Sequence, residues 1–82
     1  MYYIDFNNGL EMTGYSTLED AVKDADNHAS YTQLNIYICC STNDNIIARR
    51  IWWSKPYDPL FDPDKNPICF GDLGFYSDWR YF

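Results

Sequence analysis

Two arginines and two tryptophans fall within five consecutive positions, 49–53, of a chain that is otherwise acidic. Arginine and tryptophan together can bind phosphate groups and stack on nucleic-acid bases. The same residue types are enriched among the dominant contacts of protein–protein interfaces. The stretch therefore predicts either a contact surface or, if the C-terminal segment covers it, a second aromatic core.

The residue types that usually carry catalysis are few. His28 is the single histidine among 82 residues, and nucleophilic catalysis needs a base beside the nucleophile. The carboxylate pair Asp62 and Asp64 lacks a calcium-loop pattern, and no glycine-rich phosphate loop is present. We therefore expect no enzymatic activity and no cofactor, and we expect His28 to contact the helix C-terminus or lie on the surface.

A zinc site could be written from three cysteines and the histidine: Cys39, Cys40, Cys69 and His28. The chain has no C-x-x-C spacing, and adjacent cysteines on a strand point to opposite faces. An odd number of cysteines also argues against a disulfide framework. We predict reduced, metal-free thiols and a cytoplasmic protein, in the host cell.

The net charge of −6 arises entirely in residues 1–44, which hold seven acidic residues and one lysine, whereas residues 45–82 hold five of each sign. A field of this sign repels phosphate backbones and attracts basic surfaces. The charge predicts a protein partner with a basic surface and no direct nucleic-acid binding. No apolar run is long enough for a membrane span and no secretory signal is visible, so no membrane contact is expected.

The elements that must position these residues follow from the hydropathy pattern. Residues 2–6 alternate as a strand does, Asn8-Gly9 suits a type I′ turn, and residues 10–13 predict the returning strand of a hairpin. Residues 16–29 predict one amphipathic helix that begins with a capping box of Ser16 and Glu19. Its apolar stripe is Leu18, Ala21, Val22, Ala25 and Ala29.

The opposite face of this helix carries a row of carboxylates: Glu19, Asp20, Asp24 and Asp26. We predict that this acid row contacts the basic partner surface. The alternative is a solvated helix face that only keeps the protein in solution.

Residues 33–40 and 46–53 predict two further antiparallel strands. If Asn43-Asp44 is a two-residue turn, Ile36 lies opposite Ile51. The core side then holds Ile47, Ile51 and Trp53, which would share one core with Leu18, Val22 and Ile36. The outer face holds Arg50 and Trp52 beside Tyr37, and these three complete the predicted partner-binding set. A slip of one residue would exchange the two faces.

Four prolines between positions 56 and 67 predict an ordered loop or flap. Residues 68–70 predict a short strand, and the aromatic tail should pack over a sheet face. The predicted fold is a single α+β domain, residues 1–82, with an N-terminal hairpin, one helix on an antiparallel sheet and an aromatic C-terminal flap.

Three stretches, "YYIDFNNGLEMTGYSTLEDAVKDADNHASYTQLNIYI", "ARRIWW" and "PICFGDLGFYSDW", together resemble a family of small uncharacterised proteins of Gram-positive gut bacteria, their phages and mobile elements. The family supplies no catalytic residues. Proteins of this size, acidity and setting are similar in type to anti-CRISPR proteins. The resemblance implies an inhibitor that occupies a basic, nucleic-acid-binding surface of a host defence protein, as a DNA mimic does. The alternative is a structural or regulatory interaction domain.

Overall fold

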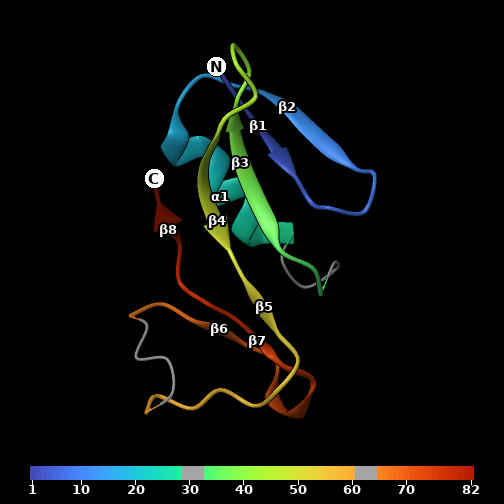
Figure 1. Cartoon of the computed structure of the whole chain (residues 1–82), viewed down its shortest axis with the longest axis vertical. Helices are drawn as coiled ribbons and strands as arrows, with labels where there is room; N and C mark the ends of the chain where they lie inside the picture. The colour runs from blue at the N-terminus through green and yellow to red at the C-terminus, as the bar shows by residue number, and fades with distance from the viewer. Residues whose placement is uncertain (29–32, 61–64) are drawn as a thin grey trace.

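The computed structural model describes residues 1–28, 33–60 and 65–82. Its larger part is a five-stranded antiparallel sheet with one helix on one face, and its smaller part is a three-stranded antiparallel sheet. The two parts follow one another along the long axis of a molecule that measures 37 × 23 × 17 Å (Figure 1). The predicted α+β class is confirmed.

The five-stranded sheet has the strand order β2-β1-β3-β4-β8, and the three-stranded sheet has the order β5-β7-β6. The strands of the first sheet are β1 (Tyr2–Asp5), β2 (Glu11–Tyr15), β3 (Ile36–Cys40), β4 (Ile46–Arg50) and β8 (Arg80–Tyr81). Those of the second are β5 (Trp52–Trp53), β6 (Ile68–Cys69) and β7 (Phe75–Tyr76). The helix α1 spans Leu18–His28, and a short 3₁₀ turn, η2, spans Gly71–Leu73.

The first hairpin is confirmed, but its loop differs from the predicted type I′ turn. The left-handed residues are Asn7 (φ 61°) and Gly9 (φ 88°), not Asn8 and Gly9. The side chain of Asp5 accepts the Asn7 N–H at 2.8 Å, and the side chain of Asn8 accepts the Leu10 N–H at 3.0 Å. The prediction was wrong because the loop is longer than a two-residue turn: the Phe6 N–H donates to the Leu10 carbonyl oxygen at 3.2 Å, and the side chains of Asp5 and Asn8 accept N–H groups within the loop.

Helix α1 begins one residue later than the capping box predicts. Thr17 Oγ1 accepts the N–H of Asp20 at 3.1 Å, and the Thr17 carbonyl accepts the N–H of Ala21 at 3.3 Å. Thr17, and not Ser16, is therefore the N-cap residue. Ala21 and Ala25 are fully buried. The predicted apolar stripe is confirmed as far as Ala25, and Ala29 lies outside the described residues.

Replacing Thr17 by alanine is expected to lower the free energy of unfolding by about 1 kcal/mol, because an orphan N–H of the first turn loses its acceptor. Ser16 is exposed and makes no capping contact, so Ser16→Ala should change stability by less than about 0.5 kcal/mol. Urea denaturation of both variants checks this. A larger loss for Ser16→Ala would contradict the assignment of Thr17 as N-cap.

The core lies between α1 and the five-stranded sheet. Its buried members are Ile4, Phe6, Ala21, Ala25, Ile36, Ile38, Ala48, Tyr76 and Trp79. Leu18 and Val22 pack at its edge, so the predicted meeting of these two residues with Ile36 is confirmed. Ile51 is only half-buried and Trp53 is 36% exposed, so their predicted place in this core was wrong.

The error comes from the register between β3 and β4. Ile36 lies opposite Arg50 and Ile38 opposite Ala48, one residue away from the predicted pairing. The chain reverses through residues 41–45, with Asp44 at φ 59°, instead of through a two-residue turn. Since side chains alternate along a strand, this slip moves Ala48, Arg49 and Arg50 to the faces opposite to those predicted. Arg50 therefore points to the core side and Arg49 to the outer side. The register shifts again between Ile38 and Cys39, so that Ile46 lies opposite Cys39.

The C-terminal segment is part of both sheets and is not a flap. β7 lies between β5 and β6, and β8 extends the five-stranded sheet by pairing with β4. Between these strands Trp79, only 8% exposed, enters the core. The predicted strand near residues 68–70 is confirmed as β6.

Candidate functional sites

Arg50 is 3% exposed, the most deeply buried charged residue in the described part of the chain. Its Nε donates to Asp26 Oδ1 of α1 at 2.9 Å, which forms a salt bridge. Another guanidinium nitrogen donates to the carbonyl oxygens of Ser77, at 2.7 Å, and of Asn66, at 3.0 Å. Arg50 thereby connects β4 with the helix, with the segment after β7 and with the segment before β6.

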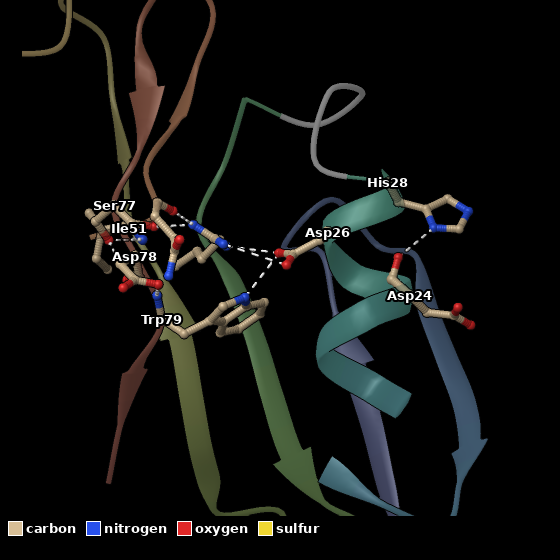
Figure 2. Close-up of polar contacts among 9 residues, drawn as sticks. Asp24, Asp26, His28, Ile51, Ser77, Asp78 and Trp79 are labelled. Atoms are coloured by element: carbon tan, nitrogen blue, oxygen red, sulfur yellow. Dashed lines mark hydrogen bonds and ion pairs between the residues drawn. The ribbon is translucent and has the colours of Figure 1, made fainter. Parts of the chain in front are cut away.

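Trp79 completes this network. Its Nε1 donates to Asp26 Oδ1 at 2.9 Å, and the Arg50 guanidinium lies 5.4 Å from the centre of the indole ring. Figure 2 shows the Asp26 carboxylate reaching from α1 toward Trp79 and toward the segment between β7 and β8 that carries Ser77. We call Arg50, Asp26 and Trp79 the arginine network. We assign the network a structural role, because it joins α1, β4 and the segments on either side of the three-stranded sheet.

Trp52 is half-buried and packs against the edge of the core. Its ring centre is 4.8 Å from that of Tyr76 and 5.8 Å from that of Phe70. Its indole N–H donates to Ser54 Oγ at 3.0 Å. The predicted outer-face positions of Trp52 and Arg50 were therefore wrong: the C-terminal segment buries Arg50 and partly covers Trp52, as the aromatic-core alternative supposed.

The acid row of α1 is only partly available to a partner. Glu19 and Asp20 are exposed, whereas Asp24 is half-buried. Burial and a hydrogen bond to Asp24 raise the pKa of Tyr15 to about 12, so the Tyr15 hydroxyl remains protonated at neutral pH and donates to that carboxylate. Asp26 is held in the arginine network. Its side chain is 34% exposed, so less of this carboxylate than predicted is open to a partner, and its part in partner binding stays a prediction.

His28 ends the helix. Its Nδ1 lies 2.8 Å from the backbone carbonyl oxygen of Asp24, which can only accept, so the ring nitrogen donates (Figure 2). The ring also packs against Phe6, with 5.9 Å between ring centres. Of the two predicted placements of His28, contact with the helix C-terminus and the surface, the structure shows the first.

The face of the five-stranded sheet that points away from α1 carries one continuous row of side chains across all five strands. The pairings Glu11–Asp5, Asp5–Tyr37, Tyr37–Arg49 and Arg49–Arg80 define it. We call these five residues the open-face row. The predicted outward position of Tyr37 is confirmed, but its arginine neighbour is Arg49 and not Arg50.

The sequence did not predict the other four members of this row, Glu11, Asp5, Arg49 and Arg80. In particular, nothing in the sequence near β4 or β8 indicates that these two strands pair. Tyr37 Oη accepts the amide of Asn35 at 3.3 Å. The Arg49 guanidinium lies 5.2 Å from the ring centre of Phe82. The row combines both charge signs with one aromatic residue, Tyr37, and such residue types suit recognition of a protein surface.

The three thiols differ from one another in burial and in the pKa of the thiol group, and Cys39 lies on β3 beside the open-face row, opposite Tyr3 and Ile46. Burial raises the pKa of Cys39, whereas a hydrogen bond from the backbone of Thr42 lowers the pKa of Cys40. Cys69 is exposed on β6. Among the described residues, no three His, Cys, Asp or Glu side chains gather closely enough to hold a metal ion. That the thiols are reduced and metal-free stays a prediction.

Within the described ranges, no helix is both long and apolar enough to cross a lipid bilayer. Comparison of the chain with protein-family models, with curated proteins and with solved structures finds no match.

Proposed function

We propose that this protein is a non-enzymatic binding protein whose acidic helix face occupies a basic, nucleic-acid-binding surface of a partner protein. The observation that carries the proposal is the exposure of Glu19 and Asp20 in the first turn of α1, in a chain of net charge −6. In the setting that the family resemblance implies, the partner is a host defence protein of the cytoplasm and the binding is inhibitory.

The way in which α1 is anchored supports this role. Ala21 and Ala25 are fully buried against the sheet, and Asp26 is fixed by Arg50 and Trp79. A carboxylate displayed from a rigid helix loses little conformational freedom on binding, so more of the electrostatic attraction appears as affinity. The arginine network thus serves the contact surface indirectly, by holding the helix that displays Glu19 and Asp20.

The double variant Glu19→Gln with Asp20→Asn is expected to weaken partner binding about tenfold, equivalent to about 1.4 kcal/mol. The side-chain shapes are kept, so the loss reports the two charges. The matched control is Asp58→Asn with Asp72→Asn, which changes the net charge equally at two exposed positions away from α1. This control should bind as the wild type does.

Binding is measured on a partner captured from host lysate, identified, purified and titrated at two salt concentrations. The association rate should fall between about 0.05 and 0.15 M salt, because the screening length falls to about 8 Å. The nucleic acid that the partner normally binds should compete with this protein for the basic surface of the partner. The proposed function is wrong if the partner binds nucleic acid and this protein at the same time, or if the double variant binds the partner as tightly as the wild type does. The acid row is then only a solvated helix face.

A further inference from the structure

The three-stranded sheet has an aromatic core of its own. Phe75 of the central strand β7 is fully buried, yet it does not belong to the core cluster between α1 and the five-stranded sheet. The ring of Tyr57 covers Phe75 edge-on, with 5.1 Å between ring centres. Trp52 and Phe70 pack against the ring of Tyr76, the next residue of β7. We call this part of the chain the aromatic unit, residues 52–60 and 65–76, and the rest of the described chain the body.

Two covalent connections join the aromatic unit to the body, and they are bonded to each other. Ile51 leads from β4 into β5, and Ser77 leads out of β7. The Ile51 N–H donates to Ser77 Oγ at 3.1 Å, and the Ser77 N–H donates to the Ile51 carbonyl oxygen at 2.9 Å. Arg50 fixes the same place, because one of its nitrogens donates to the carbonyl oxygens of both Ser77 and Asn66. The two connections therefore form one short hinge, and Figure 1 shows it between the two sheets.

Away from the hinge, hydrogen bonds that depend on side chains hold the unit against the body. The Trp52 N–H donates to Asn35 Oδ1 at 2.8 Å, and the Leu34 N–H donates to Tyr76 Oη at 3.2 Å. Residues 34 and 35 belong to the segment just before β3. We call these two bonds the latch. Neither bond continues a strand ladder from one sheet into the other, so breaking both leaves the pairing inside each sheet intact.

Apolar contact between the two parts centres on Tyr76. This residue is fully buried and belongs to the core cluster, whereas Trp52, Ile68 and Phe70 are half-buried and pack at the edge of that cluster. Two parts of a chain that meet through polar contacts usually move relative to each other, unless their interface is large and hydrophobic. Here one tyrosine contributes both to the apolar contact and, through its hydroxyl, to the latch.

We propose that the aromatic unit turns as one body about the Ile51–Ser77 hinge, and that the latch opens and closes while both parts of the chain stay folded. Residues at the ends of strands can absorb the backbone rotation that such a hinge requires. In the closed form the body covers Tyr76. In the open form the Tyr76 hydroxyl and the Asn35 amide face water, and the long axis of the molecule bends.

This device is separate from the proposed function. In Figure 1 the aromatic unit lies beyond the C-terminal end of α1, whereas Glu19 and Asp20 lie in the first turn of this helix. No hinge or latch residue belongs to the acid row. The hinge and the binding role can therefore fail independently of each other.

Amide hydrogen exchange of the wild-type protein, followed by NMR, tests the hinge. Opening breaks the latch bond of Trp52, but it keeps the strand pairing of Phe75 on β7 and of Ile38 on β3. After correction for intrinsic rates, the Trp52 amide should exchange at least about tenfold faster than the other two amides. Its exchange rate should also rise with urea below the unfolding transition, because opening exposes buried surface.

Three other results would each overturn the proposal. Equal exchange rates at Trp52 and Ile38 would mean that the chain opens only by unfolding completely. Equal rates at Trp52 and Phe75, both faster than at Ile38, would mean that the aromatic unit unfolds instead of turning. A rate at Trp52 that does not change with urea would mean that a single hydrogen bond fluctuates locally.

A substitution in the body distinguishes opening of the latch from global unfolding. Ile38 is fully buried in the body, and Ile38→Val should speed exchange of the residue 38 amide about fivefold, because global unfolding becomes easier. Exchange at Trp52 should stay unchanged, since the closed and open forms contain the same folded body. An equal increase at both amides would contradict the hinge.

A substitution in the latch completes the test. Tyr76→Phe removes the hydroxyl that accepts the Leu34 N–H, so exchange at Trp52 should become about fivefold faster. The matched control is Tyr3→Phe, which removes a hydroxyl that donates to Asp44 within the body and should leave Trp52 unchanged. The proposal is wrong if the two variants change Trp52 exchange equally, or if Tyr76→Phe removes the protection of Phe75, because the unit would then need the latch in order to fold.

Discussion

Arg50→Ala is expected to lower the free energy of unfolding by about 3 kcal/mol, while Arg49→Ala changes it by less than about 0.5 kcal/mol. Without the guanidinium, the Asp26 carboxylate loses its counter-charge, and the Ser77 and Asn66 carbonyl oxygens lose their donor. Breaking a buried ion pair costs about 3–5 kcal/mol. The lower end applies because the Asp26 side chain is 34% exposed and water compensates part of the loss.

For a domain of this size, 1 kcal/mol corresponds to about 4–8 °C in Tm, so Arg50→Ala should melt at least about 12 °C lower. Thermal and urea denaturation of the two alanine variants measure this difference. Asp26→Asn keeps the acceptor for Trp79 and should cost less than Arg50→Ala. If Arg49→Ala is instead the damaging change, β4 has the opposite register and Arg49 is the residue that faces the core.

The faces on which Arg49 and Arg50 lie could not be predicted from the sequence. The stretch 46–53 alternates in two ways, and each face carries one arginine: the first has Ile47, Arg49, Ile51 and Trp53, and the second has Ile46, Ala48, Arg50 and Trp52. Arginine is almost never buried unless it is paired, so the choice between the two faces depends on which arginine has a partner. The pair partner, Asp26, lies on another element 24 positions away, and nothing in the local pattern of the strand reports it.

A weak signal for the pairing was nevertheless present in the helix. Asp26 follows Val22 by four positions, so the two residues lie on the same side of α1, at the border of the apolar stripe. An acid at such a border needs a cation or a donor from the sheet. The helix, the hairpin and the short strand near residue 68 were predictable because their signals are local.

The open-face row could not be predicted because it depends on the order of the strands in the sheet, which a local sequence pattern does not give. It needs five strands in one order, and the outermost strand, β8, consists of only Arg80 and Tyr81. Two residues carry no periodicity. The pairing of β8 is fixed by the tertiary position of Trp79 in the core rather than by strand propensity.

The second large effect is expected at Gly74, which enters β7 with φ at 149°, a conformation that residues with a side chain rarely adopt. A Cβ atom there would lie closer than 3.0 Å to the Trp53 carbonyl oxygen and to ring carbons of Trp52. The clash is with the backbone of β5, which cannot move without leaving β7. Gly74→Ala should therefore lower the free energy of unfolding by about 3 kcal/mol or more, from overpacking and backbone strain together.

Gly71→Ala is the matched control, because Gly71 lies in the same turn at φ 60° but a Cβ there meets nothing within 4 Å. It should cost only the left-handed backbone penalty, about 1–2 kcal/mol. Urea titrations followed by tryptophan fluorescence compare the two, since Trp52 packs 4.8 Å from Tyr76 of β7 and reports the separation of the strands. Equal losses at the two glycines would mean that β5 does not lie against this turn. The pairing of Trp52 with Tyr76, and with it the cover over Trp52, would then be wrong, and Trp52 would return to the list of candidate contact residues.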